Sequence, residues 1–307
     1  MGAKRSLIHT SFGRDIGMAG TCTQGIDTGF VALGYAKVAA LGVVQGISEL
    51  LPISSTAHMR IVPAVLGWED PGSAFSAAMQ LAALAAVLSY FWADVAELTG
   101  GTVMALVKRD MTSPYLRMTI GIVLGTIPIV VLGVILSKLL NTCDSPLRSL
   151  WIIGGSCIVM AVLLGIAEVT ARHERDITEV RLRDAIYIGL AQVGALIPGV
   201  SRSGSTLTAA LWLGFQRDEA ARYSFLLGIP AIIGAGGKEL WELHKAHISA
   251  EAWGILSVGL LTASLSAFAA IWLLMHLLER FSSWPFVIYR GLMGVFLLYA
   301  VWKGILT

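Results

Sequence analysis

Charged residues are scarce in this chain of 307 residues. They make up 14% of the sequence, while 56% is hydrophobic, and soluble domains carry about 25% charged residues. This composition excludes an ordinary soluble domain. It predicts an all-α polytopic membrane protein, because a helix satisfies its own backbone hydrogen bonds in lipid. The net charge of +2 is too small to favour binding to nucleic acid.

Cysteine is also scarce. The three cysteines, Cys22, Cys143 and Cys157, are odd in number and far apart, which argues against a disulfide framework and against a cysteine metal cluster. The first residues lack the apolar core of a signal peptide. We therefore interpret residues 1–29 as a polar N-terminal tail.

Long uncharged stretches are abundant. A helix needs about 20 apolar residues to cross a bilayer, and six spans are predicted at 74–92, 118–136, 149–167, 223–237, 253–278 and 284–302. Two of these are weaker, because 223–237 is short and contains Pro230, and 284–302 contains Arg290. We expect six transmembrane helices.

Basic residues favour one side of the predicted topology. The loops 93–117 and 168–184 hold Lys108, Arg109, Arg117, Arg172, Arg175, Arg181 and Arg183. By the positive-inside rule these loops are cytoplasmic, so that both termini face outward.

Two short segments, one in each half, look like copies of one design. Residues 42–56 and 189–206 both start with Gly-x-x-Gln and continue through a Pro-containing break into a hydroxyl-rich turn. Paired interrupted hydrophobic segments indicate a binding site near the bilayer midplane. We expect two re-entrant broken hairpins, each followed by three spans, in an inverted-topology repeat. The alternative is two ordinary spans with Pro kinks.

The expected boundaries follow from this arrangement. The first repeat covers 30–168, a cytoplasmic linker covers 169–183, and the second repeat covers 184–307. Irregular backbone at membrane depth is tolerated only where it is buried in protein or lines a wet cavity. The two turns should therefore meet inside the bundle.

The first turn combines an acid, hydroxyls and an imidazole. Ser54, Ser55 and Thr56 follow Pro52 and form a natural N-cap for a helix that continues through His58. Ser55 and His58 then share one helix face as a potential nucleophile and base. Glu49 could orient the imidazole, take a proton or bind a cation. Capping alone is the alternative for each hydroxyl, and packing is the alternative for His58.

The residue one helical turn before Glu49 is Gln45. It is as well suited to a hydrogen bond between helices as to contact with a ligand.

The second turn has the makeup of a phosphate cradle. Ser201, Arg202, Ser203, Gly204 and Thr206 stand at the start of an apolar helix. Glycine lets backbone N–H groups approach an anion, the helix N-terminus adds positive charge, and Arg202 offers a bidentate fork. A purely structural salt bridge between Arg202 and Glu49 is the alternative.

These motifs resemble a known family. Residues 45–58 and 198–206 are similar to the two signature motifs of bacterial undecaprenyl pyrophosphate phosphatases, the bacitracin-resistance family, and residues 286–290 are also similar. The resemblance covers roughly residues 30–306. It implies removal of the terminal phosphate of undecaprenyl pyrophosphate, which recycles the lipid carrier for cell-wall synthesis. The implied place is the bacterial inner membrane, with the active site facing the periplasm.

The resemblance also implies site residues and a divalent cation, Mg²⁺ or Ca²⁺. The positions that match the family's functional residues are Glu49, Ser55, His58, Ser201, Arg202 and Thr206. Because Gln45 stands where the family has Glu or Gln, Glu49 is the only nearby carboxylate for a metal. The cation would then depend on the phosphates of the substrate.

The expected mechanism is attack by Ser55 on the outer phosphorus, with His58 as base or proton donor and Glu49 setting its state. His58 as the phosphorylated nucleophile is the second version. A transporter or flippase for polyprenyl phosphates is the rival function, since inverted repeats are transporter architecture. Another class of lipid phosphatase needs a His six residues after the Arg, where this chain has Thr208. Membrane lipids are the expected surroundings, and a homodimer is compatible with the sequence.

Overall fold

The computed structural model describes residues 22–23, 26–136, 147 and 149–306. Most of the predicted N-terminal tail, and Cys143, lie outside the described residues. Within that tail, the two-residue strands β1 (Cys22–Thr23) and β2 (Ile26–Asp27) pair in antiparallel fashion.

The other regular elements of the described chain are all helices, which confirms the all-α polytopic class. The α-helices are α1 (Phe30–Leu50), α2 (Ser55–Leu66), α3 (Ser73–Tyr90), α4 (Trp92–Lys108), α5 (Pro114–Ile135), α7 (Leu150–Thr170), α8 (Leu182–Val193), α9 (Arg202–Trp212), α10 (Arg217–Lys245), α11 (Ala250–Arg280) and α12 (Trp284–Trp302). The short 3₁₀-helices η2 (Ile177–Glu179) and η3 (Gly194–Leu196) precede α8 and follow it, respectively.

Five described helices, α1, α5, α7, α11 and α12, are long and apolar enough to cross a membrane, and the pair α3 and α4 makes a sixth if it is one span. Four of the six predicted spans thus correspond to α5, α7, α11 and α12, and a fifth, 74–92, corresponds to α3, which qualifies only together with α4. The expected set differs at two places. α1 qualifies although we assigned it to a hairpin, and α10, which covers 223–237, does not qualify among the described helices.

The predicted loop 93–117 is wrong in its first part. The chain bends by 78° after α3 and continues as α4. Residues such as Ala, Leu, Met, Glu and Lys favour helix, and Asp94 lies in the first turn, where an acidic group interacts well with the helix dipole. The scattered charges of this segment pointed to a loop, but they lie on an exposed helix.

The two turns have the same local structure. Ser54 and Ser201 both adopt positive φ, 74° and 68°, and both cap the helix that follows. The Ser54 hydroxyl accepts a hydrogen bond from the Ala57 N–H at 3.4 Å, and the Ser201 hydroxyl accepts one from the Gly204 N–H at 3.2 Å. The predicted helix start after Pro52 is confirmed. Non-glycine residues in such conformations are uncommon and concentrate at functional sites.

Each hairpin packs on a long helix from the other half of the chain. α1 lies against α11, and α8 lies against α5. Glycines make both contacts close: a Cβ on Gly46 would lie 2.3 Å from the Ala263 carbonyl oxygen, and one on Gly189 would lie 2.2 Å from that of Gly125. Two repeats of opposite topology would pack in this way, each hairpin against a helix of the other repeat. The inverted repeat itself stays a prediction.

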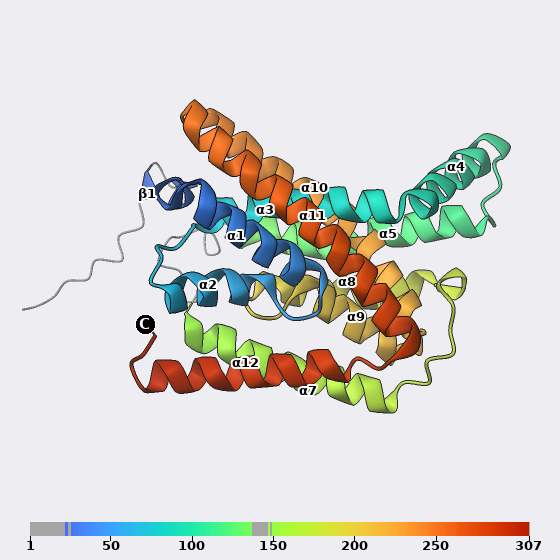
Figure 1. Cartoon of the computed structure of the whole chain (residues 1–307). Coiled ribbons are helices and arrows are strands. Elements are labelled where there is room, and N and C mark those ends of the chain that lie inside the picture. The colour runs from blue at the N-terminus through green and yellow to red at the C-terminus, as the bar shows by residue number, and fades with distance from the viewer. Residues whose placement is uncertain (1–21, 24–25, 137–146, 148, 307) are drawn as a thin grey trace, which may run out of the picture.

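The turns lie in the interior of the arrangement. Figure 1 shows α7 and α12 side by side along one edge, with α2, α8 and α9 between this pair and the other long helices. α7 and α12 approach closely through Gly154 and Gly294. The ends of α1 and α8 and the starts of α2 and α9 are thereby enclosed by helices.

Candidate active site

One buried carboxylate joins the two turns. Glu49, at the end of α1, is 6% exposed. Its Oε2 accepts hydrogen bonds from Ser55 Oγ at 2.6 Å and from Gln45 Nε2 at 3.0 Å, and its Oε1 accepts one from Arg202 Nη2 at 3.0 Å. Residues far apart in the sequence thus share one acceptor, as the meeting of the two turns predicts.

Ser55 is bonded to Glu49 and not to His58. Ser55 is the first residue of α2 and directly follows the N-cap residue Ser54. A 2.6 Å bond to a carboxylate is a charge-assisted hydrogen bond, about twice as strong as a neutral one. The group placed to accept the Ser55 proton is therefore Glu49.

His58 uses both ring nitrogens elsewhere. Its Nδ1 lies 2.7 Å from the Ser54 carbonyl oxygen, and its Nε2 lies 2.7 Å from the Tyr289 hydroxyl oxygen. The expected pair of Ser55 and His58 on one face is thus not a hydrogen-bonded pair. The i, i+3 spacing places both residues on α2, but the helix start turns the hydroxyl toward the end of α1.

Arg202 begins α9 and reaches across to the first turn. Its side chain is 11% exposed and forms a salt bridge with Glu49. The guanidinium passes close over α10, where a Cβ on Gly228 would lie 1.9 Å from Nη1. The bond to Glu49 occupies one of the five N–H groups of an arginine. Arg202 can therefore hold Glu49 and still offer donors to an anion.

The other predicted cradle residues have local roles in this structure. Ser203 Oγ donates to the carbonyl oxygens of Glu49 and Leu51, each at 3.2 Å, which ties the two turns together. Thr206 Oγ1 donates to the Arg202 carbonyl at 2.8 Å. At the start of α9 the Gly204 N–H is taken by the Ser201 hydroxyl, and the first N–H groups of a helix have no carbonyl partner within the helix. The sequence thus placed these residues in one turn, but Ser203 and Thr206 turn their hydroxyls to backbone.

Arg290 is the site residue that the sequence reasoning missed. This side chain of α12 is fully buried and donates to the carbonyl oxygens of Pro52 at 3.2 Å, of Gly199 at 2.5 Å and of Val200. It therefore links both turns to α12. The family resemblance of residues 286–290 included Arg290 but gave it no role, although a charge inside an apolar helix is itself a signal of function.

The oxygen ligands for a cation are few. The described part of the chain contains no group of three or more His, Cys, Asp or Glu that could hold a metal. The amide oxygen of Gln45 is, however, buried without a hydrogen-bond partner, next to Glu49. Hard cations prefer such oxygen ligands. Gln45 and Glu49 thus fit a cation that takes its remaining ligands from phosphate and water.

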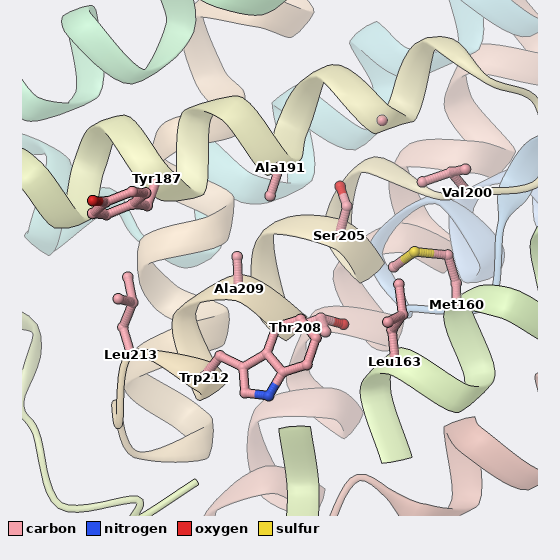
Figure 2. A pocket seen from close by; sticks show the side chains of 11 residues that line it. Met160, Leu163, Tyr187, Ala191, Val200, Ser205, Thr208, Ala209, Trp212 and Leu213 are labelled. Carbon is pink, nitrogen blue, oxygen red and sulfur yellow. The ribbon is translucent and has the colours of Figure 1, made fainter. Parts of the chain in front are cut away.

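A groove of about 530 Å³ runs along the second hairpin. Figure 2 shows its walls, which come from α7 (Met160, Leu163), α8 (Tyr187, Ala191) and α9 (Ser205, Thr208, Ala209, Trp212), with Val200, Leu213 and Gly194 completing the lining. Ser205 donates to the Arg202 carbonyl at 3.0 Å, and Thr208 donates to the Gly204 carbonyl at 2.7 Å. Since both hydroxyls are bonded to backbone, the groove presents an almost wholly apolar surface.

Comparisons with known proteins agree with the motifs. The family model described as Bacitracin resistance protein BacA matches residues 38–296. Undecaprenyl-diphosphatase 2 of Mesorhizobium japonicum is 67% identical over 261 residues, which cover 85% of this chain and 99% of that protein. Undecaprenyl-diphosphatase of Synechococcus elongatus is 49% identical over 267 residues, 87% of this chain and 93% of that protein. The chain belongs to the BacA family of bacitracin resistance proteins.

Proposed function

We propose that this protein is an integral membrane phosphatase that hydrolyses undecaprenyl pyrophosphate to undecaprenyl phosphate and inorganic phosphate, and so recycles the lipid carrier for cell-wall synthesis. The relatives named above carry this activity in their names. The observation that carries the proposal is the 2.6 Å bond from Ser55 Oγ to a carboxylate whose other oxygen is held by Arg202. It combines an activated hydroxyl with a phosphate-binding group.

In the first step Glu49 accepts the proton of Ser55 while Oγ attacks the terminal phosphorus. The new Oγ–P bond forms as the bond from that phosphorus to the bridging oxygen breaks. The bridging oxygen leaves with undecaprenyl phosphate and takes the proton from Glu49, which returns to the carboxylate form. In the second step water attacks the phosphorus of phosphoserine while Glu49 accepts a proton from that water. The Oγ–P bond breaks, Glu49 gives the proton to Oγ, and inorganic phosphate leaves.

Positive groups converge on the transferred phosphoryl group in this proposal. The N-termini of α2 and α9 both begin at the site, and each adds partial positive charge and free N–H groups. Arg202 supplies a planar fork for two phosphate oxygens. Stabilising the charge on these oxygens is the main requirement of phosphoryl transfer.

A divalent cation, Mg²⁺ or Ca²⁺, completes the charge balance in the proposal. Glu49 and the unpartnered amide oxygen of Gln45 would hold it together with the substrate phosphates. When bound, the ion neutralises charge on the phosphate oxygens.

The lipid chain occupies the groove along the second hairpin in this proposal. Val200 and Ser205 line the groove and flank residues 201–204 of the cradle, so a molecule held by its phosphate has its chain beside this surface. The apolar walls suit a hydrocarbon, and the volume is within the range of ordinary ligand sites, about 300–1,000 Å³. It accommodates the first part of a long chain rather than all of it.

We further propose that the protein lies in the bacterial inner membrane with its site open to the periplasm. The support is the positive charge of two connections between helices. The α4–α5 and α7–α8 connections carry Arg109, Arg172, Arg175 and Arg181, and such residues favour the cytoplasmic side.

The test is phosphate release by the purified protein in detergent, with undecaprenyl pyrophosphate as substrate and with or without a chelator. We expect stoichiometric inorganic phosphate and undecaprenyl phosphate, and a strong loss with chelator. A Ser55→Ala protein purified in parallel controls for contaminating phosphatases. If the wild-type protein releases no phosphate, the proposal fails, and the alternative hypothesis of a transporter or flippase for polyprenyl phosphates takes its place.

A further inference from the structure

The hydrogen-bond donor that faces His58 is on α12. Tyr289 is 47% exposed, and its ring lies parallel to the imidazole, with the ring centroids 5.7 Å apart and an interplanar angle of 5°. Its hydroxyl oxygen lies 2.7 Å from His58 Nε2. Sequence similarity had drawn attention to residues 286–290 without giving Tyr289 a role.

The two bonds of His58 fix its protonation pattern. The Ser54 carbonyl oxygen can only accept, so Nδ1 of a neutral imidazole carries the hydrogen and donates it. Nε2 then has a free lone pair, and the Tyr289 hydroxyl donates to it. Each nitrogen of the ring is thus defined by its partner, in the manner of histidines whose orientation a second residue sets.

The position of Tyr289 is itself fixed by its neighbour. Arg290 is buried and donates to carbonyl oxygens in both turns, at Pro52 and at Gly199. The dipeptide therefore fastens α12 to the two hairpins and delivers the phenol to the edge of the site. Because its neighbour Arg290 fixes this part of α12, Tyr289 loses little conformational entropy when its hydroxyl binds a partner.

We propose that Tyr289 is a positioning residue for the reaction: together with the Ser54 carbonyl, its hydroxyl holds His58 as the Nδ1–H tautomer, with Nε2 bonded to the phenol and not to Ser55. This inference rests on the proposed function for its kinetic consequence. It assigns proton removal from Ser55 to Glu49 and keeps the imidazole neutral beside the phosphate. Without the phenol, Nε2 competes with Glu49 for the Ser55 hydroxyl or takes up a proton.

The test is Tyr289→Phe, which keeps the ring and its stacking and removes only the hydroxyl. We expect kcat to fall about tenfold, the size of one lost hydrogen bond at a reacting centre, with KM unchanged. Tyr299→Phe is the matched control, because Tyr299 lies on the same helix, is 53% exposed and also contacts an aromatic ring, that of Trp302, with the ring centroids 6.2 Å apart. In a His58→Asn background, Tyr289→Phe should cause no further loss, since coupled residues are not additive.

A second readout does not need activity. Nitrogen-15 NMR of histidine-labelled protein reports the tautomer of each of the six histidines, and His58→Asn assigns the His58 signal. We expect the Nδ1–H tautomer in the wild type and a shifted mixture in Tyr289→Phe. Equal spectra and wild-type kcat in Tyr289→Phe, or a loss that adds fully to that of His58→Asn, would overturn the inference. A wild-type protein without phosphatase activity would instead refute the proposed function, while the spectra still decide the tautomer.

Discussion

The two turns share a backbone and differ in chemistry. Each has a serine with positive φ that caps the next helix, and each has carbonyl oxygens bound by Arg290. The first turn adds Glu49 and Ser55, which are groups that move protons or form bonds, whereas the second adds Arg202, a fixed cation. In the proposed function the same scaffold serves the reaction at one turn and phosphate binding at the other, and one salt bridge connects the two turns.

The largest effect should come from the first turn. Ser55→Ala removes the proposed nucleophile, so we expect kcat to fall at least about a thousandfold in the detergent assay. Thr56→Ala is the matched control, because Thr56 is the next hydroxyl and is exposed. Substantial turnover by Ser55→Ala would show that another group is the nucleophile, and would contradict the assignment of the reaction to the first turn.

Glu49→Gln should be the next most severe change. It keeps the shape of the side chain but replaces one accepting oxygen by an N–H₂ donor. It also removes the base and the charge opposite Arg202, so we expect a loss of about 10²–10⁴ in kcat. Glu69→Gln, an exposed carboxylate near α2, is the control. If kcat keeps more than half its wild-type value, Glu49 is a structural partner of Arg202 and not the base.

Changes in the second turn should weaken binding and charge stabilisation. Arg202→Lys keeps the charge and loses the fork, and we expect kcat/KM to fall about 10²-fold. Arg217→Lys is the control. Arg217 forms a comparable pair away from the site, in which its Nε donates to Glu168 Oε1 at 2.8 Å, and the lysine likewise keeps the charge and loses the fork. It should leave kcat/KM within about twofold of wild type. Equal losses in both variants would indicate a stability effect.

A smaller effect should follow from moving Arg202 without removing it. A Cβ on Gly228 would lie 1.9 Å from Arg202 Nη1, so Gly228→Ala displaces the end of a flexible side chain from Glu49. We expect kcat/KM to fall about tenfold, as for small displacements of positioned groups. Gly234→Ala on the same helix meets no atom within 4 Å and serves as the control. Wild-type kinetics in Gly228→Ala would show that the position of Arg202 is not critical.

The smallest expected effect concerns the lipid chain. Ala191→Phe fills the groove of Figure 2, and we expect KM for undecaprenyl pyrophosphate to rise about fivefold, from the loss of roughly 1 kcal/mol of apolar contact. KM for farnesyl pyrophosphate should change less, because its chain is short. Ala235→Phe on the exposed face of α10 is the control. An unchanged KM for the long substrate would place its chain elsewhere.

The sequence predicted the helices of the fold well and their bends poorly. α5, α7, α11 and α12 follow from hydropathy, since about 20 uncharged residues leave few alternatives. The 78° bend between α3 and α4 was missed, because no proline or glycine marks the break. The residue at the break is Phe91, which is buried against Tyr90 and Phe225. We assigned α1 to one arm of a hairpin. Hydropathy alone did not show that the helix continues through residues 30–50, up to the turn, and is therefore long enough to be a candidate span.

The candidate site was predictable by residue type but not by pairing. Glu49, His58 and Arg202 could be named because ionisable groups are costly in apolar segments, and Ser55 because it lies in the hydroxyl-rich turn after Pro52. Spacing along α2 suggested that Ser55 pairs with His58, but the partners come from α1 and α12, which no local pattern specifies. Arg290 and Tyr289 were missed for the same reason, since their contacts with the turns span more than 90 positions of the chain.

The most direct test of this account is to trap the covalent intermediate. Wild-type protein is quenched during turnover of undecaprenyl pyrophosphate labelled in its terminal phosphate, and the labelled peptide is sequenced by mass spectrometry. The account predicts acid-stable phosphoserine at Ser55, absent from Glu49→Gln. Phosphohistidine at His58, with Ser55 unlabelled, would contradict it.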